Sequence, residues 1–263
     1  MTPAEQWAAE LAAWAIPQSI LDQAPESPWL HDPAAFAADD TMARDSVSAL
    51  RAIEALGGTG SVLDVGCGGG RSSLALVPPA FQITGVDSSS SMLSAFREGA
   101  QRLGAEVQGV EGRWPEVADR VGDADVVVCH HVLYNVSDIE PFVRALDAHA
   151  RQRVVVELTT AHPQSVFAPA WWHFWAIHRP TRPTADQALE TIRSFGFDAQ
   201  LELGPRPPMA RAASDMTRQV PSLRRRLCLP ADRDNEVERW LVANPVDAGN
   251  RQSATIWWDV VHG

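Results

Sequence analysis

The sequence predicts an α/β fold in which helices cover both sides of a doubly wound, mostly parallel sheet. Between about residues 60 and 160, short apolar segments alternate with stretches of helical periodicity. Two of these segments, 124–129 and 153–158, are rich in valine, so that both of their faces are apolar. Strands buried on both faces and separated by helices are typical of βαβ units.

The expected elements follow each other in a regular order. We expect seven strands, at 61–65, 81–86, 105–110, 124–129, 153–158, 200–203 and 254–261. Among the helices between them, a short one begins near Arg71 and ends before Pro78 and Pro79, because proline cannot continue a helix. Two longer ones are expected at 88–103, where serines can cap the first turn, and at 184–195.

The flanks of this core have a different composition. Residues 1–56 are helical at each end of a Pro/Asp-rich bend, and we expect them to form an N-terminal helical lid. The core itself is expected at 57–203 and 254–263, with a Trp-rich cap segment at 160–183 inside it. Residues 204–253 are expected to form a helical insertion between the last two strands.

Charge restricts the classes of partner. The 263 residues include 22 basic and 33 acidic side chains, which gives a net charge of −11, and every basic residue is arginine. A negative protein repels phosphate backbones, so sequence-independent binding of nucleic acid is disfavoured. Without lysine, neither a Schiff-base mechanism nor a P-loop lysine is available.

The cysteines and the apolar stretches indicate an intracellular chain. Cys67, Cys129 and Cys228 are far apart and odd in number, which favours three reduced thiols in the cytoplasm. The first 17 residues are acidic and lack the positive charge that precedes a secretory signal. No apolar stretch approaches the roughly 20 residues that span a bilayer, so we expect no membrane partner.

A glycine loop is the strongest single motif. The first strand runs through Asp64 into Gly66-Cys67-Gly68-Gly69-Gly70, where glycines let backbone N–H groups approach a ligand closely. A dinucleotide loop has the pattern G-x-G-x-x-G, but Arg71 stands where its third glycine is required. Asp64, just before the loop, disfavours a pyrophosphate and favours a cationic ligand.

A second carboxylate supports the same ligand class. Asp87 ends the second strand, 17 residues after Gly70. A carboxylate at that place can accept hydrogen bonds from both hydroxyls of an adenosine ribose. Together with Asp64 and the glycines, it fits S-adenosylmethionine, a cationic adenosine compound, better than a dinucleotide.

These motifs resemble a known family as a set. VLDVGCGGG at 62–70, ITGVD at 83–87 and DADVVVCHHVLYNV at 123–136 resemble the class I S-adenosylmethionine-dependent methyltransferases, over residues 58–160. The resemblance implies a Rossmann-like sheet of seven strands. It also implies that the last strand is antiparallel, with 200–203 and 254–261 together at one edge.

The resemblance also implies which residues bind the cofactor. They are Asp64, Gly66, Cys67, Gly68 and Gly70 at the loop, Asp87, Ser88 and Met92 after the second strand, Glu111, Gly112, Arg113 and Trp114 after the third, and Cys129 and His130 after the fourth. The sequence EGRWP at 111–115 departs from the Asp-Ala pair of many members. Two residues have a structural alternative, since Cys67 can be a small filler and Trp114 a packing residue.

Candidates for the chemistry follow the fourth strand. Methyl transfer from a sulfonium needs mainly alignment and exclusion of water, and a base only when the acceptor carries a poorly acidic proton. We take His131 as the base or acceptor-orienting group and Tyr134, the only tyrosine, as a second catalytic candidate. The alternative is that both histidines, 130 and 131, only hydrogen-bond the cofactor or the backbone. Other polar residues expected on this edge are Glu157, Thr159, Thr160 and His162.

Aromatic residues outside the core are candidates for the substrate site. Those at 171, 174, 175 and 178 fall on one helical face, which indicates either a helix packed on the core or an apolar substrate wall. The substrate contacts that we expect are Trp29, His162, Trp171 and Trp175. The bend at 25–36 is expected to cover the cofactor.

An arginine run marks the insertion. The three arginines at 224–226 are interpreted as a solvated helix face, which the acidic residues at 232–238 can neutralise. Contact with an anionic substrate is the alternative.

The sequence thus predicts a cytoplasmic methyltransferase that moves a methyl group from S-adenosylmethionine to an O or N atom of a small organic molecule. The alternatives are an NAD(P)-dependent oxidoreductase and a non-catalytic S-adenosylmethionine-binding protein. We expect no metal, since no ligand cluster has metal spacing. The assembly that we consider is a homodimer.

Overall fold

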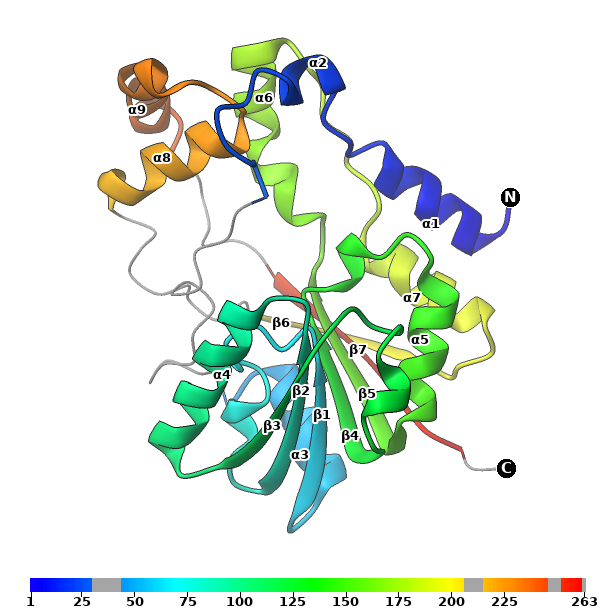
Figure 1. The fold of residues 1–263 in the computed structure, drawn as a ribbon. Helices are drawn as coiled ribbons and strands as arrows, with labels where there is room; N and C mark the ends of the chain where they lie inside the picture. The colour runs from blue at the N-terminus through cyan, green and yellow to red at the C-terminus, as the bar shows by residue number, and fades with distance from the viewer. Residues whose placement is uncertain (30–43, 206–214, 246–251, 262–263) are drawn as a thin grey trace.

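A seven-stranded sheet forms the centre of the molecule (Figure 1). The computed structural model describes residues 1–29, 44–205, 215–245 and 252–261. The strands are β1 Gly60–Val65, β2 Ala80–Asp87, β3 Glu106–Glu111, β4 Ala124–His130, β5 Ala150–Thr159, β6 Gln200–Pro205 and β7 Gln252–Asp259. Their order across the sheet is β3-β2-β1-β4-β5-β7-β6.

The predicted fold class is confirmed. Strands β1 to β5 pair in parallel, and each expected strand is present within a few residues of its predicted bounds. The antiparallel strand is β7, which lies between β5 and β6. The edge itself is therefore formed by β6, one place further out than the antiparallel strand.

Helices cover both faces of this sheet. The helices of the described ranges are α1 Pro3–Ala12, α2 Gln18–Leu21, α3 Val47–Leu56, α4 Ser90–Leu103, α5 Ile139–Ala148, α6 Ala168–Trp175, α7 Ala185–Ser194, α8 Met216–Arg226 and α9 Asp234–Ala243, of which α3, α4, α5 and α7 pack on the two faces. Alternate strand residues point to opposite faces. In β1, Leu63 belongs to the cluster under α5 and α7, whereas Val62 belongs to the cluster under α3 and α4.

The segment after the glycine loop differs from the prediction. Instead of an α-helix beginning near Arg71, the chain makes turns and the single 3₁₀ turn η2, Leu74–Leu76. The hydroxyls of Ser72 and Ser73 donate to Asp64, which draws the segment toward the end of β1. Only seven residues separate Gly70 from Pro78, too few for a stable helix once two of them are used in this way.

Helix α4 begins as its serines predict. The hydroxyl of Ser89 accepts a hydrogen bond from the backbone N–H of Met92, and Gly104 ends the helix in the left-handed conformation. Ser88 therefore lies in the loop before the helix rather than in its first turn. These caps fix the position of α4 directly after Asp87.

Four helices form a cap on the side of the sheet where the parallel strands end (Figure 1). We call α2, α6, α8 and α9 the helical cap, since they share one apolar cluster that includes Ile20, Trp171, Leu223 and Trp240. Helices α8 and α9 come from the segment between β6 and β7, where an insertion is expected. In the N-terminal segment, α1 packs on α5 and α7 and α3 packs on the sheet, so that among the described residues 1–29 and 44–56 only α2 contributes a helix to the cap.

Two further expectations concern the state of the cysteines and the length of the helices. All three cysteines are free and buried. None of the helices in the described ranges is long and apolar enough to cross a membrane.

We predict that Leu63→Ala lowers the free energy of unfolding by about 2–5 kcal/mol, because Leu63 is fully buried in β1. The matched control is Leu50→Ala on α3, where 54% of the side chain is exposed. The control should change stability by about 0.5 kcal/mol or less. Urea unfolding of both variants measures the difference, and equal effects would contradict the described packing of the sheet.

Candidate active site

The glycine loop connects the end of β1 to the neighbouring elements. Gly66, Gly68 and Gly70 all have positive φ, at 73°, 51° and 83°. A Cβ atom on Gly66 would lie 2.4 Å from Cγ2 of Val132, and one on Gly70 would lie 2.5 Å from Cδ2 of Phe96. Both the conformation and the close packing therefore require glycine at these positions.

Asp87 ties this loop to the end of β2. Its Oδ2 accepts the backbone N–H of Gly68 at 2.9 Å, and its Oδ1 accepts the N–H of Ser89 at 2.9 Å. Its own backbone carbonyl accepts the N–H of Gly112 at 3.0 Å. A carboxylate offers about four acceptor positions, so each oxygen can still accept a further hydrogen bond from a ligand hydroxyl.

Asp64 is the buried carboxylate beneath the loop. It is fully buried, and its Oδ2 accepts the hydroxyls of Ser72 at 2.8 Å and Ser73 at 2.6 Å. Its Oδ1 is buried without a partner in the described part of the chain. Burial raises the pKa of Asp64 to about 6, because a charged carboxylate is poorly solvated there.

The end of β4 carries a second unpartnered atom. Asp64 pairs with Val128, and His130, the last residue of β4, is two residues further along that strand. The Nε2 of His130 is buried and has no hydrogen-bond partner among the described residues, while burial lowers the pKa of His130 to about 4. Buried polar atoms without partners are rare, and two of them on adjacent strand ends fit a ligand that supplies the partners.

His131 contacts the end of β5. Its Nε2 lies 3.4 Å from Oε1 of Glu157, and its backbone N–H donates to the Glu157 carbonyl at 2.7 Å. The other carboxylate oxygen of Glu157 accepts the hydroxyl of Ser48 at 2.6 Å. Burial by itself raises the pKa of Glu157. The contacts with His131, His130 and Ser48 lower it by more than burial raises it, so that the pKa is about 2. The sequence placed Glu157 on this edge without indicating its partners, since Ser48 is 109 residues away.

Comparison with known proteins agrees with this geometry. Residues 62–153 match a family model described as a methyltransferase domain. The matched segment is similar to class I S-adenosylmethionine-dependent methyltransferases. It contains the glycine loop, Asp87 and His131, so the resemblance seen in the sequence is confirmed.

Curated relatives match in the same region. A ubiquinone biosynthesis O-methyltransferase of Erwinia tasmaniensis is 38% identical over 85 residues, which are 32% of this chain and 35% of that protein. One from Rickettsia felis is 28% identical over 100 residues, 38% of this chain and 40% of that protein. The chain thus spans less than half the length of the curated relatives that it matches.

Solved structures share the fold over nearly the whole chain. An S-adenosylmethionine-dependent methyltransferase from Thiobacillus denitrificans, in complex with S-adenosyl-L-homocysteine, has a TM-score of 0.55 at 17% identity and covers 94% of this chain and 99% of that one. The [4+2]-cyclase SpnF has a TM-score of 0.55 at 19% identity and covers 100% of this chain and 97% of that one. A methyltransferase and a cyclase share this fold, so the fold alone does not define the reaction.

Two residues expected in the chemistry or at the substrate are buried packing residues of this methyltransferase fold. The hydroxyl of Tyr134 donates to the Thr159 carbonyl at 2.8 Å, its ring stacks on Trp7, and burial raises its pKa. His162 is buried, stacks on Trp14 with 3.9 Å between ring centroids, and accepts the N–H of Gln164. Both side chains are thus used in packing contacts, and the catalytic role of Tyr134 and the substrate contact of His162 stay predictions.

The predicted cofactor residues divide into edge and core positions. Ser88, Glu111 and Arg113 have exposed side chains after their strands, and Met92 is half-buried in the first turn of α4. Cys67, Cys129 and Trp114 are buried in the apolar clusters. Burial raises the pKa of both thiols, and the indole of Trp114 donates to the Phe142 carbonyl at 3.3 Å. This burial supports the packing alternative for the side chains of Cys67 and Trp114, and their contact with a cofactor stays a prediction.

The Trp-rich segment builds the helical cap. Trp171 is buried in its cluster, and the Trp175 indole donates to the Leu227 carbonyl at 2.7 Å. These contacts support the packing alternative, and a contact of the two tryptophans with substrate stays a prediction. Helix α6 ends at Trp175, so His178 lies off its face and stacks on the exposed Trp172 instead.

The bend that was expected to cover the cofactor is described only in part. Trp29 is 54% exposed, and its backbone N–H donates to Ser27. Most of the bend, including His31 and Phe36, lies outside the described residues.

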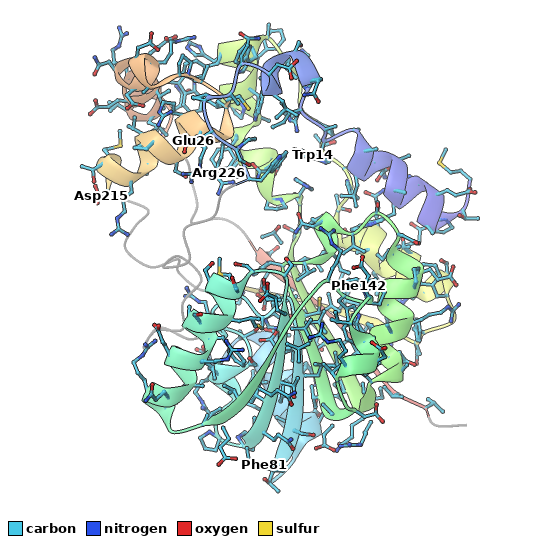
Figure 2. The ribbon with its side chains drawn as sticks, in the orientation of Figure 1. Trp14, Glu26, Phe81, Phe142, Asp215 and Arg226 are labelled. Carbon is cyan, nitrogen blue, oxygen red and sulfur yellow. The ribbon has the colours of Figure 1, made fainter. Side chains whose placement is uncertain are left out.

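The arginine run belongs to the cap and is only partly solvated. Arg224 forms ion pairs with Glu26 at 3.3 Å and with Asp234 at 2.8 Å. Arg226 lies over the ring of Phe167, in the part of the cap nearest the sheet (Figure 2). This run is therefore a half-buried part of the cap, and the prediction of a solvated face is wrong.

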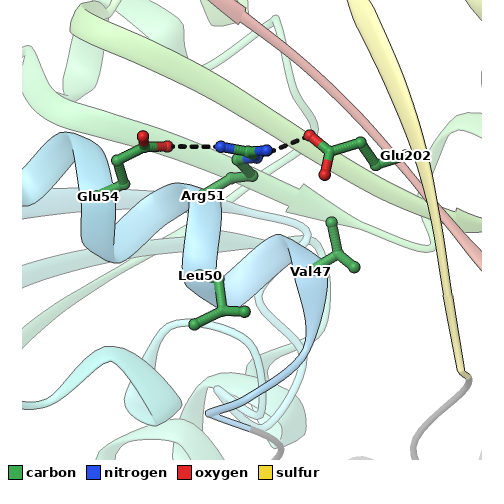
Figure 3. Close-up of a pocket in the computed structure, with 5 residues that line it drawn as sticks. All are labelled: Val47, Leu50, Arg51, Glu54 and Glu202. Atoms are coloured by element: carbon green, nitrogen blue, oxygen red, sulfur yellow. Dashed lines mark hydrogen bonds and ion pairs between the residues drawn. The ribbon is translucent and has the colours of Figure 1, made fainter.

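A hollow lies between α3 and β6. It is lined by Val47, Leu50, Arg51, Glu54 and Glu202, with Arg51 paired to both carboxylates (Figure 3). The described residues contain no cluster of His, Cys, Asp or Glu that could hold a metal ion.

We predict that Glu157 makes the stability of the fold acid-sensitive. Because the pKa of about 2 in the folded state lies below the ordinary value of 4.5, ionised Glu157 stabilises the fold above about pH 4.5, and this contribution disappears as the pH falls toward 2. The gap between the two pKa values corresponds to about 3 kcal/mol. The raised pKa of Asp64 has the opposite effect on stability between about pH 4 and 6. This effect is the same in the wild type and in variants at other positions, so it does not alter the comparison between them.

Urea unfolding between pH 7 and pH 3 tests this prediction. Glu157→Gln should be less stable than the wild type at pH 7 and lose less stability on acidification. Glu140→Gln, which removes an exposed partner of Arg144, should keep the wild-type slope. If Glu157→Gln also kept that slope, the assignment of Glu157 as an ionised buried carboxylate would be wrong.

Proposed function

We propose that this chain transfers a methyl group from S-adenosylmethionine to an O or N atom of a small organic molecule. The observation that carries the proposal is the carboxylate of Asp87, which is fixed by the N–H groups of Gly68 and Ser89 and retains acceptor capacity toward a ligand. This arrangement suits a pair of ribose hydroxyls. Bound S-adenosylmethionine would supply an electrophilic methyl group on a sulfonium ion.

The charges at the site favour a cation over a pyrophosphate. Asp64 and Asp87 are both near the loop, close enough for the charge of Asp87 to raise the pKa of Asp64. A pyrophosphate at the same loop would be repelled by both carboxylates, which disfavours the oxidoreductase alternative. The unpartnered Oδ1 of Asp64 and Nε2 of His130 would gain polar partners from the cofactor or its bound water.

We propose His131 as the base that accepts a proton from the methyl acceptor. Its side chain is 47% exposed on the strand-end edge, next to the loop. The curated relatives are ubiquinone biosynthesis O-methyltransferases, which supports an oxygen atom as the acceptor. Methyl transfer needs no obligatory side chain, so a non-catalytic S-adenosylmethionine-binding protein is the second candidate.

Location and partners are proposed on the same basis. Three free, buried thiols support a reducing compartment such as the cytoplasm. The net charge of −11 supports a small molecule rather than nucleic acid as the partner. The homodimer also stays a proposal, and sedimentation of the full chain would test it.

We predict that Asp87→Ala weakens binding of S-adenosylhomocysteine by about 1.5–3 kcal/mol, or roughly tenfold to a hundredfold in Kd, through loss of charge-assisted hydrogen bonds. Isothermal titration calorimetry measures this. Glu98→Ala removes an exposed carboxylate from α4 and is the control that should bind like the wild type. An unchanged Kd for Asp87→Ala would remove the ribose assignment.

Transfer of a radiolabelled methyl group from S-adenosylmethionine to a panel of phenols, carboxylic acids and amines tests the activity itself. The proposal expects product with at least one acceptor class. Tight binding of S-adenosylhomocysteine without any transfer would favour the non-catalytic binder, and binding of NADH in its place would favour the oxidoreductase.

A further inference from the structure

Three segments far apart in the sequence meet at Glu157. Ser48 comes from the first turn of α3, Glu157 from the end of β5, and His131 from the turn after β4. The hydroxyl of Ser48 donates to Oε2 of Glu157 at 2.6 Å, and Nε2 of His131 lies 3.4 Å from Oε1. Because Ser48 occupies one oxygen, the carboxylate is held with its other oxygen toward the imidazole.

The protonation of Glu157 decides which nitrogen of His131 carries hydrogen. Glu157 is 6% exposed, and its pKa of about 2 keeps it ionised at neutral pH. An ionised carboxylate only accepts hydrogen bonds, so the nitrogen that faces it must be the N–H of a neutral imidazole. The lone pair is then on Nδ1, and this atom makes no hydrogen bond within the ranges that the structure describes.

The backbone of His131 supports the same orientation. Its φ is 61°, a left-handed conformation that residues other than glycine rarely adopt. Its N–H donates to the carbonyl of Glu157 at 2.7 Å, so both the main chain and the side chain of His131 are held by one residue. Strained residues of this kind concentrate at functional sites, where neighbouring contacts maintain them.

The other charged groups nearby leave this pair undisturbed. His130 is the neighbouring titratable group, and burial lowers its pKa to about 4, so it is neutral at pH 7. Ser46, which caps the start of α3, contacts Ser48 through the two hydroxyls at 3.1 Å and adds no charge. Among the described residues, the cation that can form next to Glu157 at neutral pH is therefore His131 itself.

We infer that Glu157 and Ser48 are positioning residues that hold His131 as its Nε2–H tautomer and direct Nδ1 toward the methyl acceptor. This inference rests on the proposed function. When the acceptor atom bonds to the methyl carbon, the methyl–sulfur bond breaks with its electron pair left on sulfur. The acceptor proton moves to Nδ1, the imidazolium is stabilised by ionised Glu157, and the proton then leaves to water. The 3.4 Å separation fits a contact that shortens as the imidazole becomes charged.

The tautomer can be measured without knowledge of the acceptor. Two-bond ¹H–¹⁵N correlation spectra of the full chain labelled with ¹⁵N-histidine, assigned by comparison with His131→Asn, report which nitrogen carries hydrogen. Asparagine tolerates positive φ, so this variant keeps the backbone. The wild type should show the Nε2–H tautomer alone, and Glu157→Leu should show a measurable share of the Nδ1–H tautomer beside it. A wild-type Nδ1–H tautomer, or the same tautomer proportions in Glu157→Leu as in the wild type, would overturn the inference.

Kinetics with an acceptor from the transfer assay provide the second readout. Glu157→Gln should lower kcat at least tenfold and Ser48→Ala several-fold, with KM and the Kd of S-adenosylhomocysteine changed less than about threefold. The double variant His131→Asn/Glu157→Gln should be no slower than His131→Asn alone, because the two residues act as one unit. Additive losses, or a wild-type kcat in Glu157→Gln, would contradict the inference.

Matched controls separate positioning from general destabilisation. Glu140→Gln and Ser94→Ala alter exposed side chains on α5 and α4, and both should keep the wild-type kcat. If Glu157→Leu does not fold, Ser48→Ala carries the test, since it removes one hydroxyl and leaves the carboxylate. Failure of the wild type to bind S-adenosylhomocysteine would refute the proposed function but not the tautomer, so the two failures are distinguishable.

Discussion

The structure depends on one hydrogen bond between the glycine loop and a strand end, from the N–H of Gly68 to the carboxylate of Asp87. It connects the loop after β1 to the end of β2, while Gly66 packs against Val132 after β4. Three neighbouring strand ends are thereby held in fixed relation. Their polar groups, on Asp64, Asp87 and His130, lie around one loop as a consequence, and this is the physical basis for a single adenosyl site.

The helical cap adds a second layer with its own apolar core. Its helices come from the N-terminal segment, from the segment after β5 and from the segment between β6 and β7. Trp171 and Trp175 pack in the apolar cluster that these parts share, and the indole of Trp175 donates a hydrogen bond to the segment after α8. The cap therefore resembles a separate small core placed over the strand ends, and aromatic content alone does not indicate a substrate wall.

The sequence was sufficient for the parts of the fold that depend on local pattern. Valine-rich strands, the serine cap of α4 and the glycine loop each follow from residues close together in the chain. The roles of Tyr134 and His162 could not be predicted, because their partners, Thr159 and Trp14, are 25 and 148 residues away. The Ser48–Glu157–His131 contacts were missed for the same reason. Side chains on one strand-end edge can be grouped from the sequence, but which of them are already used in packing depends on tertiary contacts.

A crystal structure of the full chain grown with S-adenosylhomocysteine and NADH at equal concentrations tests the central claim most directly. The account predicts electron density for S-adenosylhomocysteine alone above the glycine loop, with both ribose hydroxyls within 3.2 Å, a normal hydrogen-bond distance, of the Asp87 carboxylate. Density for the pyrophosphate of NADH at the loop, or a ribose that does not contact Asp87, would contradict it.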